Sequence, residues 1–205
     1  MTSRPLFILP APILRETALP VAAMTDTIRT LMTDMTETMQ AADGLGLAAP
    51  QIGISTRVIV MQCPDNPTPT TTYTYTPLSL ADSDMLGEPH ADGLAAPKLW
   101  KMANPQIIAK SDETITWEEG CLSIPDVKGE VTRPKWVRVR YLAESGQEEE
   151  MEAEGLLAVC IQHEIDHLNG RLFIDYLSRT KRDMIVRKFT KEARYARQPQ
   201  ASLSA

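Results

Sequence analysis

The sequence predicts an α+β fold, and three stretches of the chain carry this prediction. Residues 26–42 repeat apolar side chains at the spacing of one helical face. Residues 136–142 alternate apolar and basic side chains, as a half-exposed strand does. Residues 154–168 are apolar on nearly every side over a helical length, which is typical of a core helix. At 205 residues the chain suits one domain with a substantial core.

The first predicted helix, residues 26–42, has an apolar face made of Ile28, Leu31, Met32, Met35 and Met39. We interpret its methionines as core-packing residues, because the flexible thioether side chain fills irregular gaps. Residues 57–61 follow this helix and are rich in β-branched side chains, which favours a strand.

A hairpin and a second helix are predicted in the second half of the chain. The strand at residues 136–142 is followed by Ser145-Gly146, a dipeptide typical of turns, and by an acidic return strand containing residues 148–150. The helix of residues 154–168 comes next. Asn169-Gly170 predicts its end, because glycine readily adopts the left-handed conformation of a helix C-terminus.

This second helix carries His163-Glu164-Ile165-Asp166-His167, which uses two of the three histidines in the chain. Residues four apart share a helical face, so both imidazoles can reach one metal ion. Glu164 lies about 100° around the helix from His163, where it can contact a water on that ion. Such an HExxH pattern is typical of metal-assisted hydrolysis with the glutamate as proton acceptor. The alternative is a buried helix whose histidines are satisfied core residues.

A catalytic metal usually takes three protein ligands, so a third ligand is expected elsewhere in the chain. Cys160 shares the helical face, but it lies about 10 Å along the axis from His167, too far for one ion. We interpret Cys160 as a small apolar residue beside the site. Phe173 stands where metzincin proteases have their third histidine, and phenylalanine cannot bind a metal.

The other candidates for the third ligand lie in less suitable segments. Glu192 belongs to a strongly basic stretch, His90 lies in a Pro/Thr-rich stretch, and Cys63 borders that stretch. Cys121 is therefore the favoured third ligand.

Three separated motifs show a resemblance to peptide deformylases, the metalloenzymes that remove the formyl group from nascent bacterial polypeptides. In the family's order, they are Gly44-Leu45-Gly46-Leu47-Ala48-Ala49-Pro50-Gln51, Glu119-Gly120-Cys121-Leu122-Ser123 and Gln162-His163-Glu164-Ile165-Asp166-His167. The resemblance extends from Pro5 to the C-terminal helix, except for residues 64–98. It implies antiparallel β-sheets wrapped around a central HExxH helix, with an N-terminal and a C-terminal helix.

The resemblance also implies roles for individual residues in deformylating formyl-Met nascent peptides. The implied metal ligands are Cys121, His163 and His167. The implied catalytic residues are Glu164 as general base, Gln51 and the Leu122 N–H as oxyanion donors, and Gly46 in the segment along which the substrate aligns. The implied substrate-binding residues are Leu45, Gly46, Trp117, Gly120, Leu156, Val159 and Cys160.

One divalent metal ion is the expected cofactor. A thiolate and two imidazoles suit Fe²⁺, Zn²⁺, Ni²⁺ or Co²⁺. The resemblance implies Fe²⁺ as the physiological ion and Zn²⁺ as the ion often present after purification. A thiolate ligand and an odd number of cysteines, three, indicate the reducing cytoplasm. No membrane association is expected, because prolines interrupt residues 1–14 and no stretch is long enough to span a bilayer.

The net charge of −6 is unevenly distributed. Residues 179–197 contain eight basic and two acidic side chains, a local charge of +6 that leaves −12 on the rest of the chain. This distribution argues against a protein that binds free nucleic acid in general, because most of the chain is acidic. It permits the basic segment alone to bind an acidic partner. The resemblance implies contact with the ribosome near the peptide exit, and the alternative is a solvated helix face.

We predict one domain over residues 1–205, with a Pro/Thr-rich insertion at about 64–98 and a basic C-terminal helix at about 178–197. The insertion is expected to be a long surface loop. It is either neutral or a rim element that shapes access for longer peptides, and the neutral interpretation is favoured.

Three other functions are weighed against deformylation. A zincin-type metallopeptidase shares the helix motif, but Phe173 and Cys121 oppose it. A structural metal module would need a fourth protein ligand and would have no use for Glu164 or Gln51. An inactive deformylase homologue acting as a ribosome-associated binding protein is the remaining alternative, because the insertion is able to block the cleft.

Overall fold

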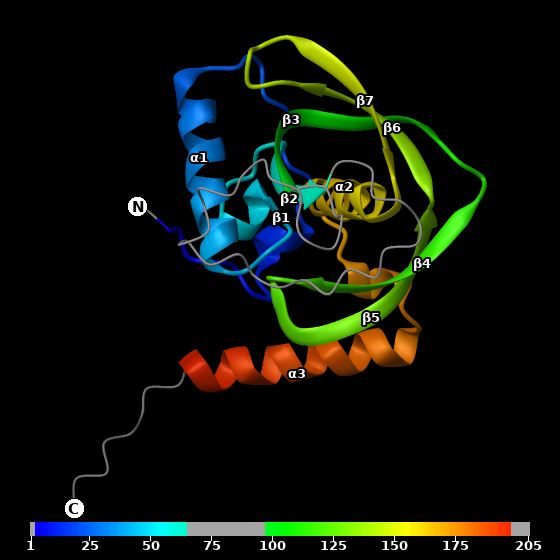
Figure 1. The fold of residues 1–205 in the computed structure, drawn as a ribbon. Coiled ribbons are helices and arrows are strands. Elements are labelled where there is room, and N and C mark those ends of the chain that lie inside the picture. The colour runs from blue at the N-terminus through cyan, green and yellow to red at the C-terminus, as the bar shows by residue number, and fades with distance from the viewer. Residues whose placement is uncertain (1–2, 65–96, 198–205) are drawn as a thin grey trace, which may run out of the picture.

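The computed structural model describes residues 3–64 and 97–197 and combines helices with antiparallel sheets (Figure 1). The predicted class, mixed helix and antiparallel sheet, is confirmed. The helices are α1 (Asp26–Ala41), α2 (Gly155–Leu168) and α3 (Arg179–Arg197). The strands are β1 (Gly46–Ala48), β2 (Val58–Pro64), β3 (Pro97–Lys110), β4 (Thr114–Cys121), β5 (Ile124–Pro134), β6 (Trp136–Leu142) and β7 (Glu148–Glu154). Two short 3-10 helices that matter for the site are η2 (Ala49–Ile52) and η4 (Phe173–Tyr176).

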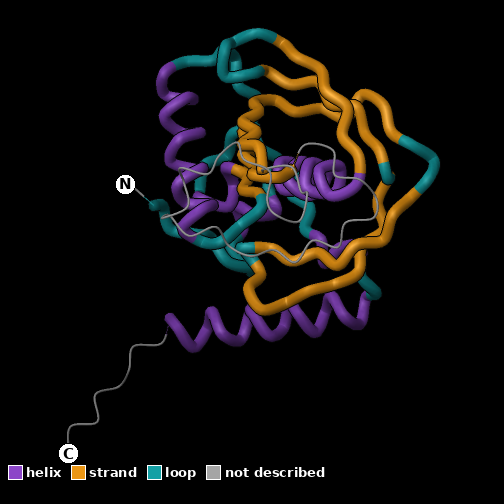
Figure 2. The backbone as a smooth tube through the Cα atoms, viewed as in Figure 1, coloured by secondary structure: helices purple, strands orange, loops and turns teal. Residues whose placement is uncertain are grey.

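The described strands form two sheets. The larger sheet has the order β1-β2-β3-β6-β7, and every neighbouring pair in it is antiparallel. Strands β4 and β5 pair with each other as a separate hairpin. Figure 2 shows these strands curving around the space that α2 occupies. The long strands β3, β4 and β5 had no counterpart among the elements predicted from sequence patterns.

Helix α2 begins directly where β7 ends. Gly155 has a φ of +58°, a left-handed conformation that glycine adopts without steric penalty, so the chain turns from strand to helix without a loop. The α2 side chains are buried along most of the helix, and they contact strands of both sheets. The main core cluster joins α2 to β2, β3, β6 and β7.

Helix α1 packs on the other side of β1 and β2. Its first turn is capped by Thr25, whose side-chain oxygen accepts a hydrogen bond from the Ile28 backbone N–H. The methionines of its apolar face, Met32, Met35 and Met39, are fully buried in a second core cluster. α1 thereby covers one face of β1 and β2 at the edge of the sheet. β1 contains Gly46 of the Gly44–Gln51 motif.

Helix α3 lies along the β4–β5 hairpin (Figure 1). Phe189 is its buried anchor and packs in a third core cluster with Ile124 and Val131 of β5 and with Phe173. One face of α3 is therefore part of the core, while most of its basic side chains are exposed. None of the described helices is long and apolar enough to cross a membrane.

The predicted insertion lies mainly outside the described residues. Only its first residue, 64, and its last two, 97 and 98, are described, and they belong to β2 and β3, which pair with each other. The expectations about a surface loop or a rim element therefore concern residues outside the described ranges.

Two methionine substitutions test whether α1 depends on core packing. Met35→Ala should reduce the free energy of unfolding by about 2–5 kcal/mol, because it leaves a cavity at a fully buried position. Met184→Ala, on the 65 % exposed Met184 of α3, should change it by no more than about 0.5 kcal/mol. Urea denaturation of the metal-free protein measures both, and equal effects would contradict the packing described for α1.

Candidate metal centre

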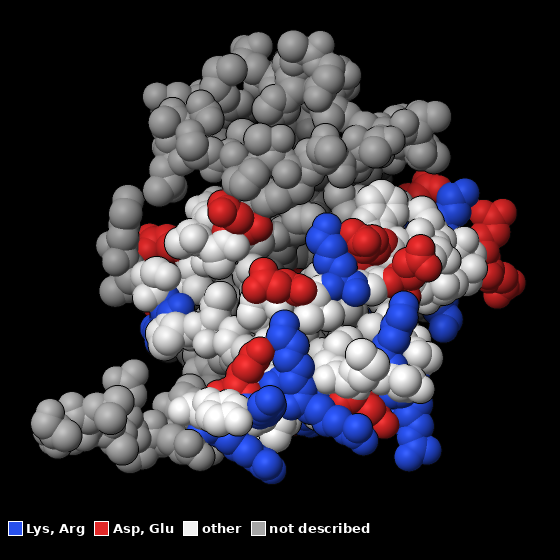
Figure 3. All heavy atoms as spheres, turned by 90° about the horizontal axis from the view of Figure 1, so that it is seen from below, with Lys and Arg blue, Asp and Glu red and all other residues white. Residues whose placement is uncertain are grey.

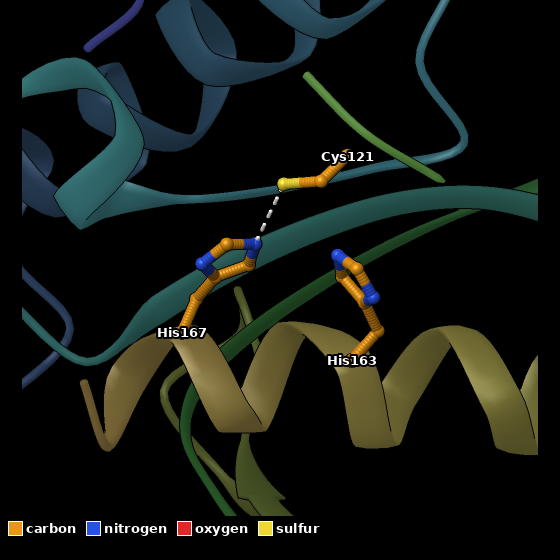
Figure 4. Close-up of side chains that lie close together, drawn as sticks. All are labelled: Cys121, His163 and His167. Carbon is orange, nitrogen blue, oxygen red and sulfur yellow. Dashed lines mark hydrogen bonds between the residues drawn. The ribbon is translucent and has the colours of Figure 1, made fainter. Parts of the chain in front are cut away.

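Three side chains from two distant parts of the chain converge at one point (Figure 4). Cys121 is the last residue of β4, whereas His163 and His167 lie one turn apart on α2. The ligand atoms, one from each side chain, all lie within 4.8 Å of one another. Sγ of Cys121 is 3.2 Å from Nε2 of His167. Donors this close can share one ion at bond lengths of about 2.0–2.3 Å.

Cys121 reaches α2 because the β4–β5 hairpin is irregular at its end. The pairing register shifts between Gly120 and Cys121, so that Cys121 is paired with Ile124 across a very short turn. Ile124 is fully buried, which fixes the start of β5 in the core. The turn is also held from outside, because the Leu9 backbone N–H donates to the Ser123 carbonyl at 2.9 Å.

His163 is oriented by a buried carboxylate. Its Nδ1 lies 2.7 Å from Oε2 of Glu119, which leaves Nε2 for an ion. Burial tends to raise the pKa of Glu119, but hydrogen bonds from His163 and Arg133 outweigh it and lower that pKa below its usual value. Glu119 is therefore an anion that can accept the Nδ1–H of His163.

The two imidazoles differ in their affinity for protons. Burial tends to lower the pKa of His163, but hydrogen bonds with Cys121 and Glu119 raise it well above its usual value. Burial, reinforced by the positive charge of His163, lowers the pKa of His167 well below its usual value. A divalent metal requires neutral imidazoles and a thiolate, so an ion bound here would replace the proton that the surroundings of His163 favour.

Glu164 lies beside the three ligands and is almost completely buried. Burial raises its pKa to about 7. Its Oε2 has no hydrogen-bond partner within the described part of the chain. Gly46 leaves room for this carboxylate, because a Cβ atom at position 46 would overlap with it. A carboxyl group with such a pKa can take up and release a proton near neutral pH.

Gln51, from η2, points its amide into the same region. Its Oε1 accepts a hydrogen bond from the Ala48 backbone N–H at 2.8 Å. Its Nε2 donates to Oγ of Ser123 at 3.2 Å and lies 3.6 Å from Sγ of Cys121. The amide is thus held with its NH₂ group toward Cys121, and the predicted oxyanion donor lies next to the predicted metal ligands.

The expected substrate-binding residues come from α2, from β4 and from the chain at the start of β1. Leu156, Val159 and Cys160 are buried on α2, while Leu45 and Trp117 are partly buried against the main core cluster. Gly120 lies on β4, next to Cys121. A hydrogen bond with Cys63 and burial raise the pKa of Cys160 well above its usual value, so this thiol behaves as a small apolar group.

Four residues around the centre were not identified as functional from the sequence: Glu119, Arg133, Asp166 and Tyr176. Arg133 binds both Glu119 and Asp166, and Tyr176 binds Asp166. The only signal in the sequence was that Glu119 and Asp166 stand close to the predicted ligands Cys121 and His167. Such acidic residues predict a basic side chain as partner, but they do not predict which one.

The comparison with known families agrees with this geometry. The sequence profile of the family described as polypeptide deformylase matches residues 3–183. The chain belongs to the polypeptide deformylase family. It is an enzyme that removes the N-formyl group from newly synthesised polypeptides, and members of this family are metalloenzymes. The comparisons do not favour a zincin-type peptidase or an inactive binding protein.

Individual deformylases are similar over nearly the whole chain. The peptide deformylase of Rhizobium meliloti is 45 % identical over 194 residues, which cover 95 % of this chain and 96 % of that protein. The one from Bartonella tribocorum is 46 % identical and covers 95 % of each chain. The crystal structure of the Ehrlichia chaffeensis peptide deformylase in complex with actinonin superposes with a TM-score of 0.76 at 36 % identity, covering 95 % and 99 % of the two chains.

The buried carboxyl of Glu164 should destabilise the metal-free deformylase at neutral pH. The unfolded chain ionises this group at a pKa of 4.5, whereas the folded protein ionises it at about 7, so its contribution to stability falls as the pH rises between these values. Glu164→Gln cannot ionise. Above the higher pKa it should raise the free energy of unfolding by on the order of 3 kcal/mol, and the gain should shrink toward the lower pKa.

Urea denaturation of the metal-free proteins at several pH values measures this effect. Glu130→Gln, which changes an exposed glutamate of β5, is the matched control and should leave the pH dependence unaltered. A difference between the Glu164→Gln and unsubstituted proteins that is independent of pH would contradict the role of burial.

Proposed function

We propose that Cys121, His163 and His167 hold one divalent metal ion, and that Glu164, Gln51 and the Leu122 N–H carry out the hydrolysis of the formyl group. The observation that carries this proposal is the convergence of the three ligand atoms within 4.8 Å beside a buried carboxyl whose pKa is about 7. That α2, the helix carrying the HExxH segment, is the central helix of the deformylase fold belongs to the same proposal.

Three protein ligands are the number that catalytic metal sites typically have, and they would leave room for water or substrate on a bound ion. When bound, a divalent ion there supplies Lewis-acid chemistry that polarises the formyl carbonyl and acidifies water. We propose Fe²⁺ as the physiological ion, on the basis of similarity to the family. The donors also accommodate Zn²⁺, Ni²⁺ or Co²⁺, so metal analysis after anaerobic preparation distinguishes these ions.

Glu164 acts as the proton carrier in this proposal. A carboxylate formed near pH 7 accepts a proton from the water that attacks the formyl carbon. The same group then donates that proton to the departing amine, so that formate and a free N-terminal methionine are released. Burial serves this role, because it brings the pKa of Glu164 close to the working pH.

Gln51 and the Leu122 backbone N–H stabilise the negative charge that develops on the formyl oxygen. The Gln51 amide needs little rearrangement for this, because Ala48 and Ser123 already hold both of its ends. Preorganised donors of this kind stabilise the transition state more than the ground state.

The substrate peptide is proposed to extend along β1. This strand is at the edge of the larger sheet as described, and Gly46 brings its backbone close to Glu164. An extended peptide can pair with such an edge backbone to backbone. The methionine side chain then lies among Leu156, Val159 and Cys160, an apolar surface suited to an unbranched thioether.

Substitution of the two proposed catalytic side chains separates chemistry from metal binding. Glu164→Gln should retain the metal and lose about 10²–10⁴-fold in kcat for a formyl-Met dipeptide. Gln51→Ala should raise the barrier by about 3 kcal/mol. Formate release and metal content are the measurements, with Glu130→Gln and Gln106→Ala at exposed positions as matched controls. Normal turnover by Glu164→Gln would refute its assigned role.

We also propose that the enzyme works in the cytoplasm and contacts the ribosome through α3. Among the described residues Cys63, Cys121 and Cys160 are free thiols, which suits a reducing compartment. Figure 3 looks onto α3 from below and displays Lys and Arg side chains gathered over this helix. A basic surface of this kind is complementary to ribosomal RNA.

Charge reversal tests the proposed contact better than truncation, because Phe189 of α3 is part of the core. The combined variant Arg187→Glu, Lys191→Glu and Arg194→Glu changes only exposed side chains. It should co-sediment with ribosomes roughly tenfold more weakly while hydrolysing a formyl-Met dipeptide normally. A control that preserves charge, Arg187→Lys with Arg194→Lys, should bind like the unsubstituted protein. Equal sedimentation of the reversed variant would exclude the contact.

A further inference from the structure

A buried arginine links the two elements that supply the metal ligands. Arg133 lies near the end of β5, and its side chain is only 3 % exposed. Its Nε and Nη2 donate to the two carboxylate oxygens of Glu119 at 2.5 and 3.0 Å. Its Nη1 donates to Oδ2 of Asp166 on α2 at 2.8 Å. One guanidinium therefore joins β4 to α2.

We propose that Arg133 is a positioning residue of the metal centre, which holds Glu119 so that its carboxylate orients His163 toward Cys121. The inference rests on the proposed function, since it concerns the ligands of that metal site. It assigns a role in metal binding to a side chain that contacts none of the three ligands among the hydrogen bonds and ion pairs described.

The geometry of the guanidinium explains why an arginine stands at this position. Glu119 uses both oxygens for Arg133, and its Oε2 also faces Nδ1 of His163. The carboxylate plane is thus fixed by a two-point contact, and His163 can rotate little without losing its hydrogen bond. A lysine carries the same charge, but its ammonium group cannot form this planar fork while also reaching Asp166.

The network is closed on its outer side by Tyr176. The Tyr176 hydroxyl donates to Oδ2 of Asp166 at 2.9 Å, the same oxygen that Arg133 binds. The guanidinium carbons of Arg133 and Arg171 lie 4.8 and 4.7 Å from the centre of its ring. Asp166 is therefore held from two sides, so it can serve as a second fixed anchor for Arg133. A continuous series of contacts thus joins His163 to Tyr176, the last residue of η4, which lies shortly before α3. The intermediate residues are Glu119, Arg133 and Asp166.

Two lysine variants test the proposal. Arg133→Lys keeps the buried charge but loses the fork, whereas Arg138→Lys is the matched control on β6, where Arg138 pairs with Glu152 at the surface. The metal-free proteins are titrated with Co²⁺ against a chelator, and the near-ultraviolet and visible absorption of the Co²⁺ complexes is recorded. Circular dichroism and thermal denaturation show whether each variant folds.

The expected result is that Arg133→Lys binds Co²⁺ about 10–100-fold more weakly and with an altered absorption spectrum, while Arg138→Lys matches the unsubstituted protein. A folded Arg133→Lys with unsubstituted affinity and spectrum would overturn the positioning role. If Arg133→Lys does not fold, Glu119→Gln decides, because it removes the carboxylate through which Arg133 is proposed to act on His163. Unchanged Co²⁺ affinity and spectrum there would equally overturn the role.

The proposed metal site has its own readout in the same experiment. If the unsubstituted protein gives no Co²⁺ complex with thiolate absorption, the metal centre itself is wrong, and this inference is wrong with it. If the unsubstituted protein gives that complex and Arg133→Lys gives the same one, only the role of Arg133 is wrong.

Discussion

The polar side chains of α2 lie inside the protein, and their hydrogen bonds to surrounding strands are the constraint on which the rest of the structure depends. Gln162 donates to the Pro134 carbonyl at 3.0 Å, His163 contacts Glu119, and Asp166 binds Arg133. A buried polar group without a partner is costly, so α2 can occupy the interior only when β4 and β5 lie beside it. Strand placement and helix burial are therefore coupled.

Two polar atoms of the HExxH segment are exceptions to this rule. Oε2 of Glu164 and Nδ1 of His167 are buried and have no hydrogen-bond partner among the described residues. The same burial that makes Glu164 unfavourable as an anion raises its pKa to about 7, where it is useful for proton transfer. The structure tolerates this local cost because the core clusters around α1, α2 and α3 bury many apolar side chains.

The β4–β5 hairpin brings the distant parts of the chain together. One end of it presents Cys121 to α2, its strands carry Glu119 and Arg133, and its underside packs on Phe189 of α3. The apolar face of α3 thus supports the strand that bears Arg133, while the exposed face of the helix carries basic side chains. One helix can in this way stabilise the region of the metal centre and offer a charged surface outside it.

Short-range patterns in the sequence were sufficient for α1, β6 and α2, because helical and strand periodicity is a local property. They also placed two histidines on one helical face, since that follows from the helical repeat alone. Patterns did not predict β3, β4 and β5. Buried and exposed side chains alternate irregularly along β3. They do alternate along β4 and most of β5, but the inward positions include Glu119, Gly129 and Arg133, so this alternation does not appear as a hydrophobic repeat in the sequence.

Nor did they identify Arg133, because a single arginine in a strand has no local signature. Its role depends on Glu119 and Asp166, which lie on different elements and meet only after the chain has folded. Periodicity thus specified which side chains share a face, whereas folding specified which faces meet, because such contacts join residues far apart in the chain.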